Sequence, residues 1–596
     1  MVLKDALDKD SLFSPFQLLL VFLISTPLTL CSTHNFIQIF TGAVPPHHCR
    51  SNFTQRRSNQ TDLCTRYISP LSNETEPCGE NGWEYDHSVY SSTIISEWDL
   101  VCQWEFLKEM AQSIYMAGVL VGAIMYGTLA DRFGRRIVLL CCVLQVATMG
   151  TGTALSPNFS FYCVFRFLTG MGMCGFVING LGLTMEWIPM RYRPTVSMVQ
   201  GYCLTAGQII LGGVAYACRD WRWLQMALSL PFFIFFVLVW WVPESYRWLV
   251  LTNRSQKALT NLNRVAKING KKIGSDITLE MLQLESQNET STKTSRYTPL
   301  DLFRTPAMRR ITLSLTLIWF SSSFCFFALA MDVQRFGFSI YLVQVIFGCT
   351  ELPLRIISTI TASYIGRRFT VSFLLILSGV LILLSLALPP DRMILQLSFT
   401  ALAKGCLGSS IVCAYLYTAE LFPTLLRQTG IGFTNMMMRL GAVITPLVIV
   451  TKAYMPSLPT IIFGVLPIFC GVPILWLPET LNCPLTDTIE EVETRSRELN
   501  GILHSSDTNL IRTKNTIAGV FLGGVFVYHL LALVTISLNP PLSVPTADQR
   551  RRLCEIGKNV ATLCFISASR NQRHFLLLLL GINDIFTAGL YRGFPG

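Results

Sequence analysis

The sequence carries little charge for its length. Only 14% of its 596 residues are Asp, Glu, Lys or Arg, whereas 51% are hydrophobic. This excludes an ordinary soluble protein, because a soluble surface needs more charge. Uncharged runs of about 20 residues recur along the chain, and each is long enough to cross the hydrocarbon of a bilayer. The composition therefore indicates one large bundle of membrane-spanning helices.

Two kinds of site are also missing from the sequence. No nucleotide-binding loop with Gly-Lys-Ser/Thr is present, which argues against direct ATP hydrolysis. The apolar runs hold no lattice of carboxylates that would require sodium. We therefore expect no enzyme activity, no cofactor and no metal. The net charge of +11 comes mainly from short connections between apolar runs, so it follows the positive-inside pattern and does not indicate nucleic acid as a partner.

The charged motifs of the chain occur twice, at a nearly constant spacing. Thr184, Glu186, Pro189 and Arg193 recur as Thr418, Glu420, Pro423 and Arg427; Pro243-Glu244-Ser245 recurs as Pro478-Glu479-Thr480; and Gly134-Arg135-Arg136 recurs as Gly366-Arg367-Arg368. Repeats of this length, each with several spans, are typical of transporters whose substrate path lies between two related halves.

Each repeat contains six apolar runs of spanning length. In the first half we predict spans at Phe16–Phe40, Gln112–Ala130, Ile137–Leu155, Phe161–Met185, Val196–Ala217 and Gln225–Val242. In the second half we predict spans at Ile311–Met331, Ser339–Ala362, Thr370–Leu388, Ile394–Ala419, Thr429–Val450 and Pro459–Leu477. Twelve spans put both termini on one side. The arginines in the connections on that side predict that it is the cytoplasm: Arg132, Arg135, Arg136, Arg191, Arg193, Arg367, Arg368 and Arg427.

The spans divide the chain into four parts. Residues 1–242 form an N-terminal six-helix half with a retained first helix and an extracellular loop at 41–108, and residues 243–310 form a cytoplasmic linker with short helices. Residues 311–480 form the C-terminal six-helix half. Residues 481–596 form a cytoplasmic or atypical tail with an extra apolar segment at 516–538, which is long enough to span but would put the Arg550–Arg552 patch on the unfavourable side.

The extracellular loop carries the marks of an oxidising compartment. Asn52, Asn59 and Asn73 stand in Asn-x-Ser/Thr sequons, which predicts a glycosylated loop. Four cysteines in such a loop predict two disulfides, although three pairings are possible. These cysteines are Cys49, Cys64, Cys78 and Cys102.

The connection between the second and third spans resembles the hallmark loop of the major facilitator superfamily, with Gly127-Thr-Leu-Ala-Asp131-Arg132-Phe-Gly134-Arg135-Arg136. The resemblance implies an all-α membrane protein with the major facilitator fold, twelve transmembrane helices in two pseudo-symmetric six-helix halves. Asp131 can pair with helix ends or arginines in one access state; the alternative is an arginine cluster that only sets topology. The second copy has Ser363 at the position of Asp131. Expected gating residues are Asp131, Arg132, Arg135, Arg136, Glu186, Arg193, Glu244, Arg247, Glu420, Arg427 and Glu479.

Further motifs narrow the resemblance to the organic ion transporter family, from about residue 5 to residue 495. They include the cysteine-bearing loop, Gly82-Trp-Glu-Tyr85, Glu97-Trp-Asp-Leu-Val-Cys102, Asp220-Trp-Arg222-Trp and Pro243-Glu-Ser-Tyr-Arg-Trp248. Three segments are most similar to the organic anion transporter branch of this family, which is solute carrier family 22: Asp301-Leu-Phe-Arg304-Thr-Pro306, Ala330-Met-Asp332-Val-Gln334 and the run from Ala419 to Gly430.

Arg439 is the main candidate for contact with a substrate anion. It lies in the middle of the eleventh span, without an acidic residue one turn away on the same helix. An ionisable group in a span usually faces a partner or an aqueous pathway. In the family, anion carriers have arginine at the matching position and cation carriers have an acid. The alternative is a structural arginine paired with another helix.

Two further cations lie in spans. Arg355 in the eighth span has Glu351 four residues before it, a spacing that allows the two side chains to neutralise each other. Arg355 could therefore bind substrate or form a structural ion pair. The anion branch usually has lysine at this position, so the geometry changes from a point charge to a planar fork. Lys404 in the tenth span matches a lysine that is also common in cation carriers.

The rest of the site should be apolar and aromatic, because amphipathic anions need surface to bury. The family pattern suggests Phe320, Phe326, Phe327 and Tyr415, with His34, Asn35 and Gln208 as polar additions. Phenylalanine replaces the usual tyrosines at two of these positions, which favours bulky monoanions over small dicarboxylates.

The resemblance implies a secondary-active, sodium-independent organic anion transporter that works by alternating access. We expect it to act as a monomer in the plasma membrane, with a cytoplasmic N-terminus, and to exchange amphipathic carboxylates or sulfates such as prostaglandins, steroid sulfates, urate-like or drug anions for a counter-anion. Two alternatives stay open: a carrier of organic cations or zwitterions, which would need a free acid in the cavity, and a non-transporting receptor-like protein with the carrier fold.

Overall fold

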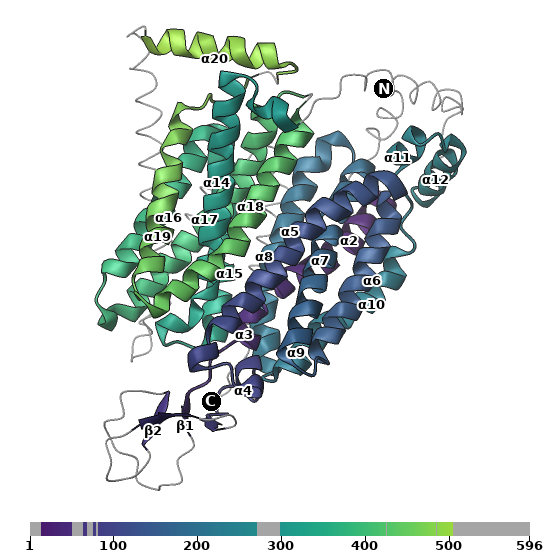
Figure 1. Ribbon diagram of the computed structural model, residues 1–596. Coiled ribbons are helices and arrows are strands. Elements are labelled where there is room, and N and C mark those ends of the chain that lie inside the picture. Colours follow the sequence, from purple (N-terminus) through teal and green to yellow (C-terminus); the bar gives the residue numbers. More distant parts are fainter. Residues whose placement is uncertain are drawn as a thin grey trace, which may run out of the picture. The chain divides into compact units, whose positions relative to one another are not determined.

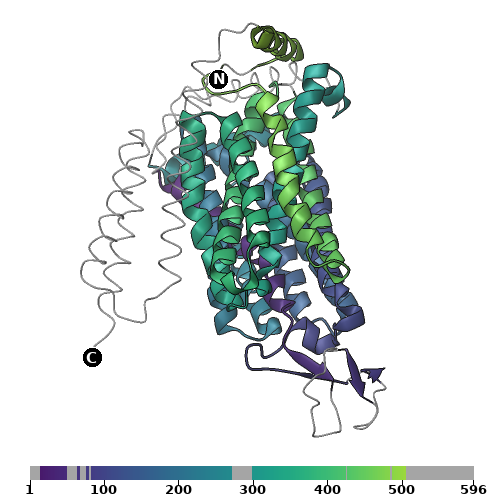
Figure 2. The ribbon, with the colours of Figure 1, turned by 90° about the vertical axis from the view of Figure 1, so that its left-hand side faces the viewer.

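The computed structural model describes residues 14–49, 64–67, 75–78, 82–270, 299–424, 426–483 and 486–504. Within these ranges, twelve helical segments are long and apolar enough to cross a membrane. Figures 1 and 2 show these segments running side by side as one helical bundle. The predicted number of spans and the all-α fold are thereby confirmed.

Six spans come from the N-terminal half. They are α2 (Pro15–Phe36) continued by α3 (Gln38–Thr41), α5 (Phe106–Phe133), α6 (Arg135–Ala154), α7 (Phe159–Trp187), α8 (Arg193–Ala217), and α9 (Trp221–Ser229) followed by α10 (Pro231–Val239). Pro231 occupies the first position of α10, where its missing N–H costs nothing. The span therefore divides at this proline.

The other six spans come from the C-terminal half. They are α14 (Pro306–Met331), α15 (Ile340–Tyr364), α16 (Arg367–Ala387), α17 (Met393–Leu421), α18 (Arg427–Val450) and α19 (Leu458–Gly471). Short 3-10 turns connect or extend helices: η1 (Cys102–Trp104), η2 (Met190–Tyr192), η3 (Pro299–Phe303), η4 (Val333–Phe336), η5 (Pro390–Arg392), η6 (Thr451–Ala453) and η7 (Pro473–Trp476).

Several helices begin earlier than the hydropathy predicts. Helix α5 starts at Phe106 and α14 starts at Pro306, whereas the apolar runs suggested Gln112 and Ile311. The added turns carry charged side chains, such as Arg309 and Arg310. A charged residue ends an apolar run but does not end a helix, because Lys, Arg and Glu are good helix formers.

The two halves pack by the same plan. In the first half α7 contacts α5 and α6, and α2 contacts α8; in the second half α17 contacts α15 and α16, and α14 contacts α18. Close approach depends on glycine at α5–α7, where a Cβ on Gly118 or Gly170 would clash with backbone of the other helix. Helices α5 and α18, and α8 and α15, join one half to the other.

The two ends of the bundle differ in what they carry. At one end, which we call the disulfide end, β1 (His47–Cys49) pairs antiparallel with β4 (Trp83–Tyr85), β2 (Thr65–Tyr67) pairs antiparallel with β3 (Thr75–Pro77), and α4 (Ile94–Trp98) follows. In β1 and β4, His47 stands opposite Tyr85. Disulfides join Cys49 to Cys78 and Cys64 to Cys102.

The opposite end, which we call the arginine end, carries the Arg135 and Arg367 connections. Its surface helices are α11 (Tyr246–Leu251), α12 (Ser255–Ile268) and α20 (Ile489–His504), which lie at the top of Figure 1. The three sequons at Asn52, Asn59 and Asn73 and the apolar segment 516–538 lie outside the described residues.

Candidate functional site

The predicted site residues fall into separate groups around the contact between the halves. Ser113 on α5 donates a 3.1 Å hydrogen bond to the carbonyl of Val443 on α18, and the rings of Phe36 and Phe327 stack across the halves at 5.8 Å. These contacts come from four helices of both halves. A molecule bound here would touch both repeats.

Arg439 lies between the two halves. Its charge acts on Tyr115 and Cys174 from the N-terminal half and on Tyr415 from the C-terminal half. Its Nε is buried and has no hydrogen-bond partner, and the guanidinium forms no ion pair with the described acids. Burying an uncompensated cation is costly. The position therefore suits a side chain that meets an anion supplied from outside the fold.

Aromatic and polar groups lie beside Arg439. Tyr415 is 43% exposed, whereas most residues in the apolar part of its helix, α17, are buried. Its hydroxyl donates to Asn435 Oδ1 at 2.5 Å, and its ring meets Trp319 edge-on at 4.4 Å. Phe320, also half-buried, stacks on Phe324. We call Arg439, Tyr415, Asn435, Trp319 and Phe320 the central site.

The sequence did not single out Trp319 or Asn435. Asn435 could have been found, because it precedes Arg439 by four residues and therefore shares its helix face. Trp319 could not, because it reaches Tyr415 only through the packing of α14 on α17.

A second group of charges is closed on itself. Glu351 Oε1 accepts from Arg355 Nε at 3.0 Å, and Glu351 Oε2 accepts from Lys404 Nζ at 3.1 Å. Glu351 and Lys404 are fully buried. Thr205 and Gln208 of α8 donate to the same carboxylate, each at 3.3 Å. We call Glu351, Arg355 and Lys404 the charge triad; its acid is neutralised, so it offers no free cation site.

Several residues that the sequence placed in the substrate site belong to this triad or contact it. Gln208 Oε1 accepts from Lys404 at 2.7 Å. The ammonium of Lys404 also lies 4.5 Å from the ring centre of Phe326 and 5.7 Å from that of Phe36. Phe326 is only 7% exposed. Lys404, Gln208 and Phe326 therefore hold one another, whereas the half-buried Phe327 stands at the junction with the N-terminal half.

His34 and Asn35 lie elsewhere than expected. His34 is fully buried inside the N-terminal half, where its ring packs edge-on against Phe232 at 5.9 Å. It therefore does not face the central site. Asn35 Oδ1 accepts from the Tyr115 hydroxyl at 2.8 Å, so it supports a neighbour of Arg439. Adjacent helical residues point about 100° apart, which is why the two separate.

Sequence reasoning also missed a buried cation, Arg166 on α7. Its side chain is fully buried and lies 4.2 Å over the Tyr115 ring. It donates to Gln112 Oε1 at 3.3 Å and to the carbonyl of His34 at 3.4 Å. The sequence could have indicated Arg166, because it is a single charge in a long apolar run and such residues are rare in spans.

The gating candidates of the first half form a local network at the arginine end. Arg135 pairs with Glu186 at 3.0 Å. Arg135 and Arg136 are the first residues of α6, and Glu244 accepts hydrogen bonds from their backbone N–H groups at 3.0 and 3.1 Å. A carboxylate at a helix N-terminus is stabilised by the helix dipole. Arg247 lies close enough to Glu186 for its charge to act on that carboxylate.

The second half repeats this network. Arg367 Nε lies 3.2 Å from Glu420 Oε2. Glu479 accepts from the backbone N–H groups of Arg367 and Arg368 at 2.9 and 3.2 Å. The Nε and one terminal nitrogen of Arg427 are buried without a hydrogen-bond partner among the described residues.

Asp131 and Arg132 stand apart from both networks. Both residues are exposed, and within the described ranges the Asp131 carboxylate forms no ion pair; only its backbone carbonyl accepts, from Trp248 Nε1 at 2.9 Å. Arg193, by contrast, donates to the carbonyl of Ile188 at 3.1 Å. Asp131 is thus free to take another partner in a different conformation.

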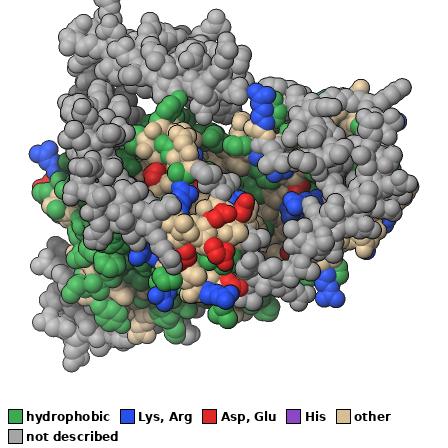
Figure 3. Space-filling model, turned by 90° about the horizontal axis from the view of Figure 1, so that it is seen from above, with side chains coloured by type: hydrophobic (Ala, Val, Ile, Leu, Met, Phe, Trp, Pro, Cys, Tyr) green, Lys and Arg blue, Asp and Glu red, His purple; other side chains and the backbone are tan. Residues whose placement is uncertain are grey.

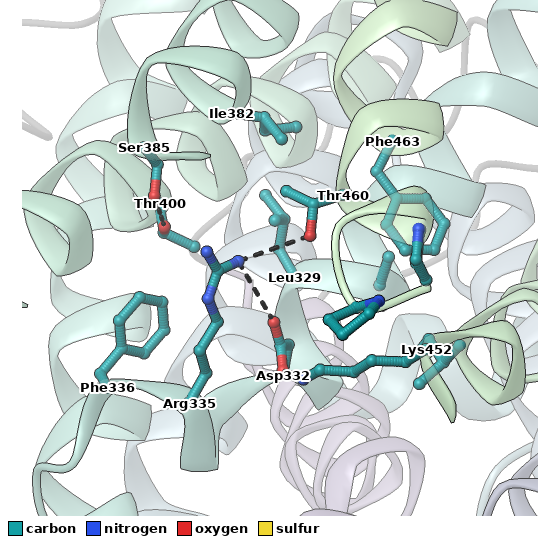
Figure 4. Close-up of a pocket in the computed structure, with 14 residues that line it drawn as sticks. Leu329, Asp332, Arg335, Phe336, Ile382, Ser385, Thr400, Lys452, Thr460 and Phe463 are labelled. Carbon is teal, nitrogen blue, oxygen red and sulfur yellow. Dashed lines mark hydrogen bonds and ion pairs between the residues drawn. The ribbon is translucent and has the colours of Figure 1, made fainter. Parts of the chain in front are cut away.

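A small cavity at the disulfide end contains the remaining acid of interest. Asp332 lies 3.2 Å from Lys452 and 3.7 Å from Arg335, whose guanidinium also reaches Thr460 (Figure 4). The cavity measures about 30 Å³, far below the volume that a drug-sized ligand needs. Asp332 is therefore a neutralised acid beside a water-sized space.

Comparison with known proteins finds relatives over most of the chain. The profile of the Major Facilitator Superfamily matches residues 105–446. Solute carrier family 22 member 6-B of Xenopus laevis is 44% identical over 545 residues, which cover 86% of this chain and 99% of that protein. Organic anion transporter 3 of Homo sapiens is 44% identical over 511 residues, which cover 83% of this chain and 94% of that protein.

A solved structure shares the fold. The inward open conformation of the xylose transporter XylE from E. coli aligns with a TM-score of 0.56 and 16% sequence identity, over 80% of this chain and 99% of that chain. At this identity the likeness concerns the arrangement of helices only.

Proposed function

The chain belongs to the organic anion transporter branch of solute carrier family 22, within the major facilitator superfamily, and on this premise we propose that it carries amphipathic organic anions across the plasma membrane. The substrate binds at the central site, with its anionic group at Arg439. The relatives named organic anion transporter 3 supply the substrate class. The geometry of Arg439 supports the placement.

The observation that carries this proposal is the contrast between Arg439 and the acids in the bundle. Arg439 lies between the halves without an ion-pair partner among the described residues. Glu351 faces two cations, Asp332 faces two more, and Glu109 on α5 lies 3.4 Å from Lys108. An organic cation would have to displace an existing partner from any of these acids. An anion would instead complete an uncompensated charge, which favours anion over cation transport.

The shape of the central site favours an amphipathic monoanion. Phe320 and the ring of Tyr415 supply apolar surface, and the fully buried Trp319 supports the Tyr415 ring from behind. Asn435 and the Tyr415 hydroxyl supply hydrogen bonds. A planar guanidinium can bind one carboxylate or sulfate with two parallel hydrogen bonds. A dicarboxylate would need a second free cation, and Arg355 and Lys404 are engaged by Glu351.

The transport cycle is alternating access between the two halves. The ion pairs at the arginine end, Arg135–Glu186 and Arg367–Glu420, each lie within one half. Contacts that cross between halves include Phe40–Tyr341, stacked at 5.5 Å, and Tyr216–Tyr341, which lie near the disulfide end of their helices. We assign this arrangement to the state in which the central site is reached from the arginine end, and we assign that end to the cytoplasm because it carries the arginine-rich connections.

Exchange follows if the central site reorients less readily when it is empty. An unfilled Arg439 must be carried through the membrane as an uncompensated charge, whereas a bound anion neutralises it. We therefore propose sodium-independent exchange with a second organic anion, by a monomer whose disulfide end is extracellular and glycosylated.

The test is uptake by cells that express the full chain. A labelled steroid sulfate should enter saturably, without dependence on sodium, and faster when the cells are preloaded with an organic anion. A labelled quaternary ammonium compound should not enter. Uptake of the cation alone, or of neither compound by protein shown at the cell surface, would overturn the proposal.

A further inference from the structure

Two exposed tryptophans mark equivalent corners of the two repeats. Trp241 precedes Pro243-Glu244 and is 67% exposed; Trp476 precedes Pro478-Glu479 and is 71% exposed. Both stand where the last span of a half ends at the arginine end. Tryptophan is enriched at the level of the lipid headgroups, where its ring meets both hydrocarbon and water. These corners therefore mark the depth of the membrane interface.

A cavity of about 160 Å³ opens beside Trp476. Its walls come from α14, α16, the end of α17, η7 and α20, and α20 forms one side of it. Three arginines from three of these helices line it: Arg310, Arg368 and Arg495. Figure 3 looks onto this end of the molecule and shows Lys and Arg side chains spread around a central group of acids.

The acid that lines this cavity is already neutralised. Glu420 lies 3.2 Å from Arg367 Nε and accepts from the Thr480 hydroxyl at 2.5 Å. Arg368 donates to the carbonyls of Leu475 and Leu477 at 3.2 and 3.1 Å through one terminal nitrogen. Its Nε is buried without a hydrogen-bond partner among the described residues. The lining residues therefore carry an excess of positive charge, and Arg368 adds one unsatisfied donor.

Arg310 and Arg495 stand at the open side of the cavity. Arg310 is exposed, and Arg495 is half-buried and donates to the carbonyl of Glu479 at 3.2 Å. The guanidinium group matches phosphate geometry better than an ammonium does, because its donors form a planar fork. The pattern predicts a phosphate-bearing ligand.

The N-terminal half has a related but more apolar cavity. It measures about 220 Å³ and lies beside Trp241, between the start of α2 and the amphipathic helix α12. Its lining is hydrophobic except for Arg264 at the rim. Both corners thus combine an exposed tryptophan, an apolar wall and an arginine from a surface helix, and the C-terminal corner has the stronger positive charge.

We propose that the cavity beside Trp476 binds the headgroup phosphate of an anionic phospholipid from the leaflet at the arginine end. Arg310, Arg368 and Arg495 hold the phosphate. The exposed side chains of Trp476 and Leu475, the latter 44% exposed, lie against the glycerol and the upper acyl chains. A free phosphate would use the arginines but not this apolar wall, so we commit to the lipid. The site is separate from Arg439 and does not depend on which substrate is carried.

The test is lipid binding by the purified full chain. Native mass spectrometry should detect phosphatidylserine bound in preference to phosphatidylcholine when both are added in equal amounts. The double variant Arg310→Gln/Arg495→Gln should reduce phosphatidylserine binding at least about ten-fold, since each arginine near an anionic surface contributes about one factor of five. Arg309→Gln is the matched control, because Arg309 is an exposed neighbour on α14 that does not line the cavity.

Three outcomes would overturn the assignment. Phosphatidylcholine could bind as well as phosphatidylserine, Arg309→Gln could lower binding as much as the double variant, or glycerophosphoserine, which lacks acyl chains, could displace the lipid at equal concentration and so indicate a plain phosphate site. Size-exclusion chromatography reports whether the variants fold. If the double variant does not fold, the wild-type competition between the two lipids and the displacement by glycerophosphoserine decide the question.

Discussion

Glu351 Oε2 lies 3.1 Å from Lys404 Nζ where the C-terminal half meets α8 of the N-terminal half, and both side chains are fully buried. The other carboxylate oxygen accepts from Arg355 at 2.5 to 3.0 Å. Thr205 and Gln208 bring the N-terminal half to the same carboxylate. A single acid thus holds two cations and joins the two repeats, whereas Arg439 is the cation that we propose as the substrate contact.

Removing the acid of this triad should destabilise the protein. We expect Glu351→Gln to lower the free energy of unfolding by about 3–5 kcal/mol, because the fully buried Lys404 and the partly buried Arg355 would lose their counter-charge. The double variant Glu351→Leu/Lys404→Met should recover part of this loss. The measurement is thermal unfolding of the purified chain in detergent.

The exposed pair at the disulfide end provides the matched control. Lys452 lies 3.2 Å from Asp332 but is 47% exposed, so Lys452→Gln should change stability by less than about 1 kcal/mol. If Glu351→Gln and Lys452→Gln proved equally harmless, the triad would not be the buried organising element described above.

The two glycines that precede α6 and α16 should be irreplaceable. Gly134 has a φ of 99° and Gly366 a φ of 126°, and a Cβ on either would lie 2.5 Å from the carboxylate of Glu244 or Glu479. We expect Gly134→Ala and Gly366→Ala each to cost about 1–3 kcal/mol of stability and to reduce transport. Unfolding temperature and uptake per surface molecule are the readouts.

Gly213 shows what an unconstrained glycine should do. It lies within α8, and a Cβ there would meet nothing within 4 Å. Gly213→Ala should be neutral or stabilise by up to about 1 kcal/mol. Equal effects of alanine at Gly134 and Gly213 would argue against the close contact between Gly134 and the Glu244 carboxylate.

The sequence predicted the charged connections at the arginine end only in part. The repeated Gly-Arg-Arg and Pro-Glu motifs indicated two equivalent charged connections, and the twelve spans followed from hydropathy. The way in which Glu244 caps α6 across more than a hundred residues did not follow, because sequence shows which residues recur but not which backbone groups they meet.

The disulfide pairing gives a prediction that thiol labelling can check. In Cys49→Ser/Cys78→Ser both members of one bridge are removed, so an impermeant maleimide should label no additional external thiol in intact cells. In Cys49→Ser/Cys64→Ser one member of each bridge is removed, so Cys78 and Cys102 should become labelled unless they pair with each other, which mass spectrometry of the digested loop would reveal. New external labelling in the first variant would contradict the pairing.

Tyr415 should contribute to substrate affinity through its ring and its hydroxyl separately. Tyr415→Phe loses the hydrogen bond to Asn435 but keeps the edge-on contact with Trp319; Tyr415→Ala loses both. A pair formed by the Tyr415 ring and an aromatic ring of the substrate should contribute about 0.5–1.5 kcal/mol. KM for an aromatic anion should therefore rise several-fold more in the alanine variant than in the phenylalanine variant. The opposite order would place the ring outside the central site.

The central site itself was only partly predictable. Arg439 and Tyr415 followed from charge in a span and from the family pattern, and the i, i+4 spacing of Glu351 and Arg355 indicated their pair. Lys404, Gln208 and His34 could not be assigned from sequence, because each lies on a span and only the rotation of its helix decides whether it faces the central site, the triad or the interior of one half.

The most direct measurement is kcat/KM for a labelled amphipathic anion in Arg439→Ala, Arg439→Lys and Arg439→Asp, corrected for the amount of protein at the cell surface. The proposed site predicts a loss of about a hundred-fold or more in the alanine and aspartate variants, because removing one partner of a buried charge pair, here the arginine that meets the substrate anion, costs about 2–5 kcal/mol. It predicts partial recovery with lysine and near-normal transport in the control Arg335→Ala, whose arginine pairs with Asp332 at the disulfide end. Wild-type kcat/KM in Arg439→Ala would contradict it.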